Sequence, residues 1–171
     1  MYRLRDVVRR AGAPERRGGD DALALGAIEA SHWEELVGSN LRAPLFIAQA
    51  AAPELARREG AIVNIVDIHA ERPLKGYPLY SMAKGGLASL TRSLALELAP
   101  RVRVNGVAPG AIAWPEDGQF EPGERERIVA TTPLGRVGAP EDIAQAVHFL
   151  ACAPFVTGQI IAVDGGRSIF L

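Results

Sequence analysis

The feature that most constrains the fold of this chain is the alternation of short apolar runs with longer segments of helical periodicity. The runs at 61–66 (AIVNIV), 102–107 (VRVNGV) and 159–163 (QIIAV) are short and β-rich, as strands are, and the first is apolar almost throughout. Strands that alternate with helices form βαβ units, in which the strands are parallel and helices cover the sheet. The sequence therefore predicts an α/β fold with a parallel sheet of about three strands flanked by helices.

Three segments between and around these strands have helical signals. The tetrapeptide 31–34 (SHWE) reads as a capping box with Ser31 at the N-cap, and it opens a long helix to about residue 58 with irregularities at Pro44 and Pro53. Leucines recur at spacings of three and four in 78–99, and a proline followed by acids opens a helix from about 139 to 151. We predict a loop for 114–124.

Composition divides the chain in two and excludes several classes of protein. Residues 1–24 hold six arginines and no apolar periodicity, so we predict a basic, poorly ordered leader before a domain at 25–171. The formal net charge of −1 does not favour a nucleic-acid surface, and no apolar run reaches the ~20 residues that a membrane span needs. The single cysteine cannot form an internal disulfide, so we expect a cytoplasmic protein.

The chemically most informative residues are a tyrosine and a lysine one helical turn apart. Tyr80 and Lys84 share one helix face, and Asp67 ends the preceding strand, where open α/β sheets place their ligands. A neighbouring ammonium favours the phenolate, so we expect Lys84 to lower the pKa of Tyr80 and make it a general acid or base. An ionised Asp67 would oppose this effect. By spacing alone, the pair is more typical of a half-buried tyrosine beside a solvated lysine.

Several motifs in order resemble the short-chain dehydrogenase/reductase family, whose fold implies a partial Rossmann-like sheet for this chain. They are Asn40, IVNIVD ending at Asp67, YSMAK at 80–84, RVNGVAPG at 103–110, PLGRVGAPEDIA at 133–144 and TGQIIAVDGG at 157–166. Most members of the family have serine at the position of Asp67. The valine–aspartate pair and the later GYPLYSMAK stretch resemble pteridine reductases more closely, as does the APGAIAWPE loop at 108–116.

This resemblance implies an NADPH-dependent reductase and gives each residue a role. Tyr80 donates a proton, and Lys84 holds the nicotinamide ribose and tunes the phenol. Asp67 binds the pterin and helps to deliver protons, and Asn40 anchors a water relay behind Lys84. Pro109 and Gly110 lie against the nicotinamide. Trp114 either lines the substrate pocket or covers the core.

The sequence departs from the family at the nucleotide-binding end. No G-x-x-x-G-x-G or G-x-G-x-x-G turn occurs in it, so the amide groups that normally bind the pyrophosphate are missing. A late start codon or a frameshift would produce such a chain, and reading the upstream DNA in all frames tests this hypothesis. We expect the strand at 61–66 to form an apolar edge of the sheet, which invites pairing with another chain.

Three functions remain open from the sequence. The first is reduction of a dihydropterin or dihydrofolate, and the second is reduction of a 3-oxoacyl or other carbonyl substrate. The third is a catalytically silent fragment that binds subunits of the same family. By resemblance, the helices at 32–58 and 78–99 pack against a second subunit, so we expect a homo-oligomer. We expect no metal site, and we expect His148 and Cys152 to pack in the core.

Overall fold

The computed structural model describes residues 23, 25–113 and 122–169. The predictions for the leader at 1–24, apart from residue 23, and for Trp114 lie outside these residues. The described helices and strands, in chain order, are α2 (Ala30–Val37), a π-helix (Gly38–Arg42), α3 (Ala43–Arg57), β1 (Ala61–Ile65), α4 (Pro78–Glu97), β2 (Arg103–Pro109), α5 (Pro122–Ala130), α6 (Pro140–Cys152) and β3 (Ile160–Val163). Short 3-10 helices follow β1, at Ile68–Ala70, and β3, at Arg167–Ile169.

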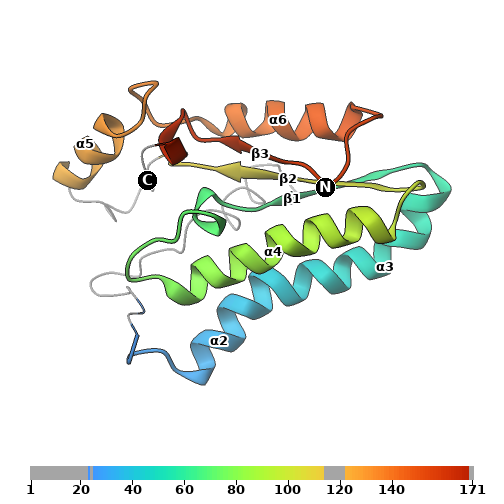
Figure 1. Ribbon diagram of the computed structural model, residues 1–171, viewed down its shortest axis with the longest axis horizontal. Coiled ribbons are helices and arrows are strands. Elements are labelled where there is room, and N and C mark those ends of the chain that lie inside the picture. Colours follow the sequence, from blue (N-terminus) through green and yellow to red (C-terminus); the bar gives the residue numbers. More distant parts are fainter. Residues whose placement is uncertain (1–22, 24, 114–121, 170–171) are drawn as a thin grey trace.

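The three predicted strands form one parallel sheet in the order β1-β2-β3. Ala61 pairs with Arg103 and Ile65 with Val107, and Gly106 of β2 pairs with Ile160 of β3. Helix α6 covers one face of the sheet, while α4 covers the other, with α3 beside it (Figure 1). The prediction of an α/β fold with a parallel sheet is confirmed, and β1 forms one edge of the described sheet.

The core lies on both faces of β2. On one face, Val107 packs with Ile143 and Leu150 of α6. On the other, Ala108 packs with Leu87 and Ala88 of α4. Burying a valine, leucine or isoleucine side chain is worth about 1.5–3 kcal/mol, so these contacts hold both helix layers on the sheet.

The first helical segment differs from its prediction in two ways. Its N-cap is Glu29, whose extended backbone donates its N–H to Nδ1 of His32 at 3.0 Å, so Ser31 lies inside the first turn. The irregularity precedes Pro44 and takes the form of a π-helix, in which the N–H of Ala43 reaches the carbonyl of Gly38. Proline has no N–H to continue the α-helical ladder, which favours this wider turn before it.

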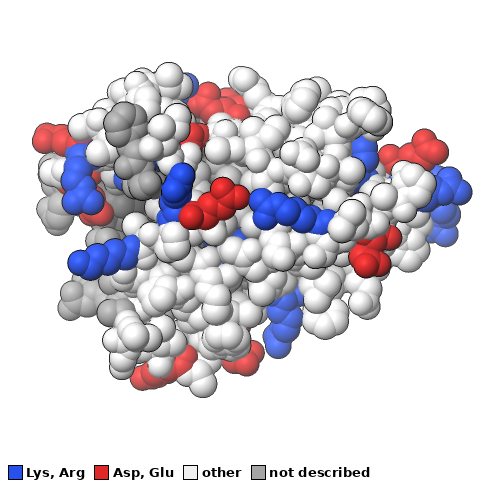
Figure 2. Space-filling model, viewed as in Figure 1, with Lys and Arg blue, Asp and Glu red and all other residues white. Residues whose placement is uncertain are grey.

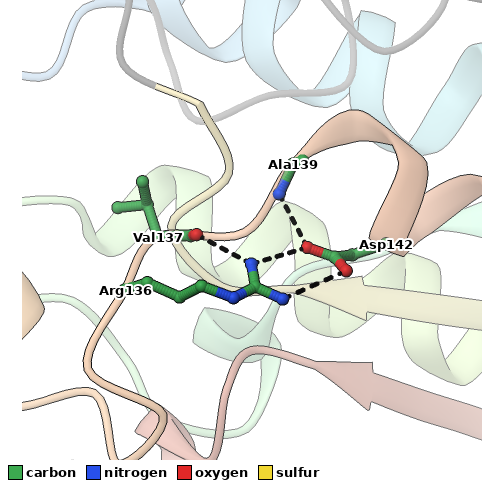
Figure 3. A network of polar contacts seen from close by, with 4 residues as sticks. All are labelled: Arg136, Val137, Ala139 and Asp142. Carbon is green, nitrogen blue, oxygen red and sulfur yellow. Dashed lines mark hydrogen bonds and ion pairs between the residues drawn. The ribbon is translucent and has the colours of Figure 1, made fainter.

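Helix α5 was not predicted, and its first three residues, 122–124, fall in the segment that was read as a loop. Helix α6 begins as expected, and a polar network fixes its start (Figure 3). The N–H of Ala139 donates to Oδ2 of Asp142 at 2.8 Å, and the same carboxylate binds the Arg136 guanidinium at 2.9 Å. Arg136 also lowers the pKa of Asp142. An acidic first turn is favourable at the positive end of a helix.

Charged side chains of both signs are interspersed on the face shown in Figure 2, in keeping with the near-zero net charge of the chain. Among the helices that the structure describes, none combines the length and the apolar character needed to cross a membrane.

A buried asparagine ties the loop before β3 to the sheet, and it supplies a stability prediction. The Asn105 side chain, which is 0% exposed, donates to the carbonyl of Val156 at 2.8 Å and accepts from the N–H of Gln159 at 3.0 Å. A buried polar group left without a partner costs about 1–3 kcal/mol. We expect Asn105→Ala to lower the free energy of unfolding by at least about 2 kcal/mol in urea denaturation.

The matched control for this prediction is Gln145→Ala, an exposed change on α6 that should stay within about 0.5 kcal/mol of the original chain. Equal stabilities for the two variants would show that Asn105 does not hold the loop.

Candidate active site

The candidate site lies at the carboxyl ends of the strands, where the sequence places it. Asp67 follows β1 and begins the Ile68–Ala70 turn, while Tyr80 and Lys84 lie in the first two turns of α4. All three side chains are buried, with 8% of Asp67 and 2% each of Tyr80 and Lys84 exposed. The expectation that these three groups converge is met, and the alternative of a solvated lysine is wrong.

Asp67 and Tyr80 are joined directly. The Tyr80 hydroxyl donates to Oδ2 of Asp67 at 2.8 Å, and the other carboxylate oxygen accepts the backbone N–H of His69 at 2.8 Å. Two donors on two oxygens fix the orientation of the carboxylate. The phenolic proton is therefore directed at Asp67 in this state.

The Lys84 side chain extends from α4 to the last residue of β1, at the same site. Its ammonium donates to the carbonyl of Ile65 at 3.1 Å and lies 5.7 Å from the centre of the Tyr80 ring. Burial lowers the pKa of Lys84, and the negative charge of Asp67 opposes that change. The lysine is thus a desolvated cation beside the Tyr80 ring.

The pKa of Tyr80 moves in the direction opposite to the prediction. Burial raises it, as the phenolate is poorly solvated there, and the charge of Asp67 and its hydrogen bond to the phenol raise it further. The lowering of the Tyr80 pKa that we expected from Lys84 is outweighed in this state. An ionised Asp67 opposes that lowering, as expected from the sequence. Tyr80 in this environment therefore holds its proton more firmly than a solvent-exposed phenol does.

Pro109 is the last residue of β2, and Gly110 follows it. Both lie at the carboxyl ends of the strands, as Asp67 does. The N–H of Gly110 donates to the carbonyl of Val163 at 3.1 Å. A Cβ at this glycine would lie 2.7 Å from Cβ of Asp164, so only glycine allows the two strand ends to approach this closely. The segment thus presents backbone, rather than side chain, at the strand ends.

Asn40 lies in the π-helix, and its described hydrogen bonds are local. Its amide donates to the carbonyl of Leu36 at 3.0 Å and to Oγ of Ser39 at 3.1 Å. Its role in a water relay behind Lys84 stays a prediction.

Two residues that were not assigned to the site from the sequence help to shape it. The N–H of His69 holds Asp67, and Oγ of the buried Ser81 accepts the N–H of Leu74 at 3.1 Å, which ties the loop after β1 to α4. An aspartate that accepts the N–H two residues later is a common turn signal, so the contact with His69 could have been predicted. The pairing of Ser81 with a residue seven positions earlier leaves no such local signal.

A cavity of about 310 Å³ adjoins Asp67 on the α4 side of the sheet. Val66, Ala88, Ala108 and Ile160 contribute apolar walls, and Arg72 and Ser168 are among its polar residues. A small molecule in this cavity would lie next to Asp67.

The pair on α6 departs from its prediction. His148 and Cys152 are exposed rather than packed in the core, because they lie on the outer face of the helix. Within the described part of the chain, no group of three or more His, Cys, Asp or Glu side chains is placed to hold a metal ion.

Comparison with known proteins agrees with this geometry. Residues 7–168 match a family profile described as Enoyl-(Acyl carrier protein) reductase. The chain is 37% identical over 153 residues to the 3-oxoacyl-[acyl-carrier-protein] reductase FabG of Thermotoga maritima, covering 87% of this chain and 62% of that protein. It is 44% identical over 147 residues to pteridine reductase 1 of Leishmania tarentolae, covering 79% and 50%.

Solved structures give the same result. A SCOR enzyme from Clostridium thermocellum aligns with a TM-score of 0.76 at 35% identity, over 86% of this chain and 58% of that one. A short-chain dehydrogenase/reductase from Brucella melitensis aligns with a TM-score of 0.76 at 33% identity, over 88% and 60%. The chain spans 50–62% of the length of these four proteins. The chain belongs to the short-chain dehydrogenase/reductase family.

Proposed function

We propose that the chain carries the proton-transfer site of an NADPH-dependent reductase that acts on the C=N bond of a dihydropterin or dihydrofolate. The observation that carries this proposal is the hydrogen bond from the Tyr80 hydroxyl to Asp67. It places an acidic proton and a carboxylate within 2.8 Å of one another at the strand ends.

The carboxylate favours a pterin over a simple carbonyl compound. A ketone or thioester offers only an acceptor oxygen, to which an ionised carboxylate cannot donate. A pterin ring offers N–H donors, which match the acceptor oxygens of Asp67, and hydrogen bonds to a charged group are the stronger kind. Asp67 therefore selects for a substrate with N–H groups next to the bond that is reduced.

Members of this family use nicotinamide dinucleotides, and the residues present fit the nicotinamide and ribose end of such a group. The Lys84 ammonium has three N–H donors and one described acceptor, the carbonyl of Ile65, which leaves donors for ribose hydroxyls. The glycines that would bind the pyrophosphate do not occur in this sequence. Lys84, Tyr80, Pro109 and Gly110 are the residues that we propose to hold the group.

When bound, NADPH supplies the hydride that adds to the carbon of the C=N bond. The nitrogen of that bond needs a proton, and the Tyr80 hydroxyl donates it. A pterin N–H that donates to Asp67 replaces the Tyr80 hydroxyl there. The contribution of Asp67 to the raised pKa of Tyr80 then becomes smaller. Lys84 then stabilises the phenolate that remains, and a proton from solvent restores the hydroxyl.

Reduction of a 3-oxoacyl or other carbonyl substrate is the second candidate. The similarity to the FabG protein of Thermotoga maritima supports it as directly as the similarity to pteridine reductase 1 supports the first. The third candidate, a silent chain that binds family-like subunits, predicts no saturable dinucleotide binding by the purified chain.

A substitution at Asp67 separates the two substrate classes. We expect Asp67→Ser to lower kcat/KM for dihydrobiopterin or dihydrofolate at least tenfold, because the substrate N–H groups lose a charged acceptor worth about 1.5–3 kcal/mol. The same change should raise kcat/KM for an acetoacetyl thioester, since serine can donate to its carbonyl. NADPH oxidation is followed by absorbance for both substrates.

The affinity for NADPH is the control. Because Asp67 is not assigned to dinucleotide binding, this affinity should be nearly the same in Asp67→Ser and in the original chain. A loss of thioester reduction together with unchanged pterin reduction in Asp67→Ser would overturn the pterin proposal in favour of the carbonyl one.

We further propose that the partner of the chain is a second copy, packed through α3 and α4. Phe46 and Ile47 of α3 and Met82 and Leu96 of α4 are exposed, although all four are large and apolar. Exposed apolar side chains on neighbouring helices are typical of surfaces that bind another protein.

A further inference from the structure

The cavity of about 310 Å³ on the α4 side of the sheet is a second candidate site, separate from the Tyr80–Lys84 pair. The strands and α4 that enclose it are seen in Figure 1, and neither Tyr80 nor Lys84 lines it. Its volume lies at the lower end of the range of about 300–1,000 Å³ that is usual for ligand pockets. A small organic molecule therefore fits it.

The cavity has uncovered apolar walls because small side chains line it. Four of its twelve lining residues are alanines, and they come from the turn after β1, from α4, from β2 and from β3: Ala70, Ala88, Ala108 and Ala162. A methyl group fills little of the space between a sheet and a helix. Ile169, which also lines the cavity, is 80% exposed although it is large and apolar. The walls thus offer apolar surface to a ligand.

The charged groups at the cavity differ in whether they have partners. Both carboxylate oxygens of Asp67 accept hydrogen bonds, and Glu71 is paired with Arg92 at 3.2 Å. Arg72 also lines the cavity, and its guanidinium forms no hydrogen bond or ion pair with any residue in the part of the chain that the structure describes. The charge that remains available to a ligand is therefore positive.

The backbone of Arg72 is held in place on both sides. Its N–H donates to the carbonyl of Ile68 at 3.0 Å, and its own carbonyl accepts a hydrogen bond from Nδ1 of His69 at 2.8 Å. The Arg72 side chain is exposed, so its guanidinium stays in contact with water. An anionic group can pair with it there without being fully desolvated, which keeps the cost of binding low.

From these observations, we propose that the cavity binds a small amphiphilic monocarboxylate, a molecule with one carboxylate and a short apolar chain. The carboxylate pairs with Arg72, because a planar guanidinium can donate to both oxygens at once. The apolar chain lies against Ala88 and Ala108. Binding breaks no covalent bond and needs no dinucleotide, so it can be measured whether or not the chain is a reductase.

Hexanoate is the probe for this site. The full chain is titrated with it at neutral pH, and binding is followed by calorimetry and by NMR of isotope-labelled alanine methyl groups. We expect saturable binding of one hexanoate per chain, with changes in the methyl signals of Ala88 and Ala162. Each CH₂ group added between butanoate and hexanoate should strengthen binding about fourfold. Hexanol should bind more weakly than hexanoate, and hexylammonium more weakly still.

Two variants test the two ends of the site. Arg72→Gln should weaken hexanoate binding by about threefold to tenfold, because it removes a bidentate but exposed ion pair, and it should leave hexanol binding unchanged. Ala162→Leu should weaken the binding of both molecules. Ala162 is exposed on β3 and lines the cavity, so leucine at this position takes up space that the apolar chain needs.

Lys75→Gln is the matched control, since Lys75 is an exposed cation three residues after Arg72 and does not line the cavity. It should leave the affinity for hexanoate unchanged. The proposal is overturned by any of three results: no saturable binding at millimolar hexanoate, equal losses in Arg72→Gln and Lys75→Gln, or unchanged affinity in Ala162→Leu. All three substitutions change exposed side chains, and circular dichroism checks that the variants fold.

Discussion

Tyr80→Phe is expected to lower the turnover of the reductase by about 10²–10⁴-fold, the contribution of a positioned acid or base, while dinucleotide affinity stays nearly unchanged. The variant keeps the buried ring and its place beside Lys84, and it removes only the hydroxyl that donates to Asp67. Steady-state NADPH oxidation measures turnover, and fluorescence titration with NADPH measures binding.

The loss of this hydroxyl also leaves Oδ2 of Asp67 without its described donor, so an indirect effect must be separated from the loss of the acid. The double variant Tyr80→Phe/Asp67→Ser provides that control, because it removes both members of the pair. If turnover in the double variant returned to the level of Asp67→Ser alone, Tyr80 would be shown to act only by positioning Asp67, which contradicts its role as the acid.

Lys84→Ala is expected to weaken dinucleotide binding by about 10–100-fold, since hydrogen bonds from a charged donor are worth about 1.5–3 kcal/mol. Turnover at saturating NADPH should fall as well, because the phenolate left on Tyr80 loses its neighbouring cation. The lowered pKa of Lys84 adds a pH signature. Affinity should decline on the alkaline side at a lower pH than the pKa of about 10.4 for a free lysine.

Lys84→Met separates charge from packing, because the side chain is 2% exposed and its truncation to alanine leaves a cavity. Methionine fills much of that space without the ammonium. We therefore expect Lys84→Met to be more stable than Lys84→Ala in urea and equally poor in dinucleotide binding. Affinity restored to the original value by methionine would show that Lys84 acts through packing alone.

The strands and the position of the site could be predicted because both follow from local patterns. Three short β-rich runs between helical segments leave few arrangements other than a parallel sheet, and the strand-end position of Asp67 and the spacing of Tyr80 and Lys84 then bring the site together. The start of the first helix was predicted two residues too late, because the preference of serine for N-caps was outweighed by the contact of Glu29 with His32.

The electrostatics of the site could not be predicted in the same way. The direction of the shift in the pKa of Tyr80 depends on how deeply the phenol is buried and on its distance to Asp67, neither of which a spacing of thirteen residues determines. The exposure of His148 and Cys152 likewise depends on which side of α6 faces the sheet. Ile143 and Leu150 occupy that side, which leaves the histidine and the cysteine outside.

The central claim is that Tyr80, Lys84 and Asp67 form a working dinucleotide-dependent site in this chain. Its most direct test is a titration of the purified chain with NADPH, followed by the midpoint of thermal unfolding. A ligand that binds only the folded state stabilises it by about 2.7 kcal/mol at 100 times its Kd. We expect saturable stabilisation that Lys84→Ala reduces, whereas an unchanged midpoint at millimolar NADPH would contradict the claim.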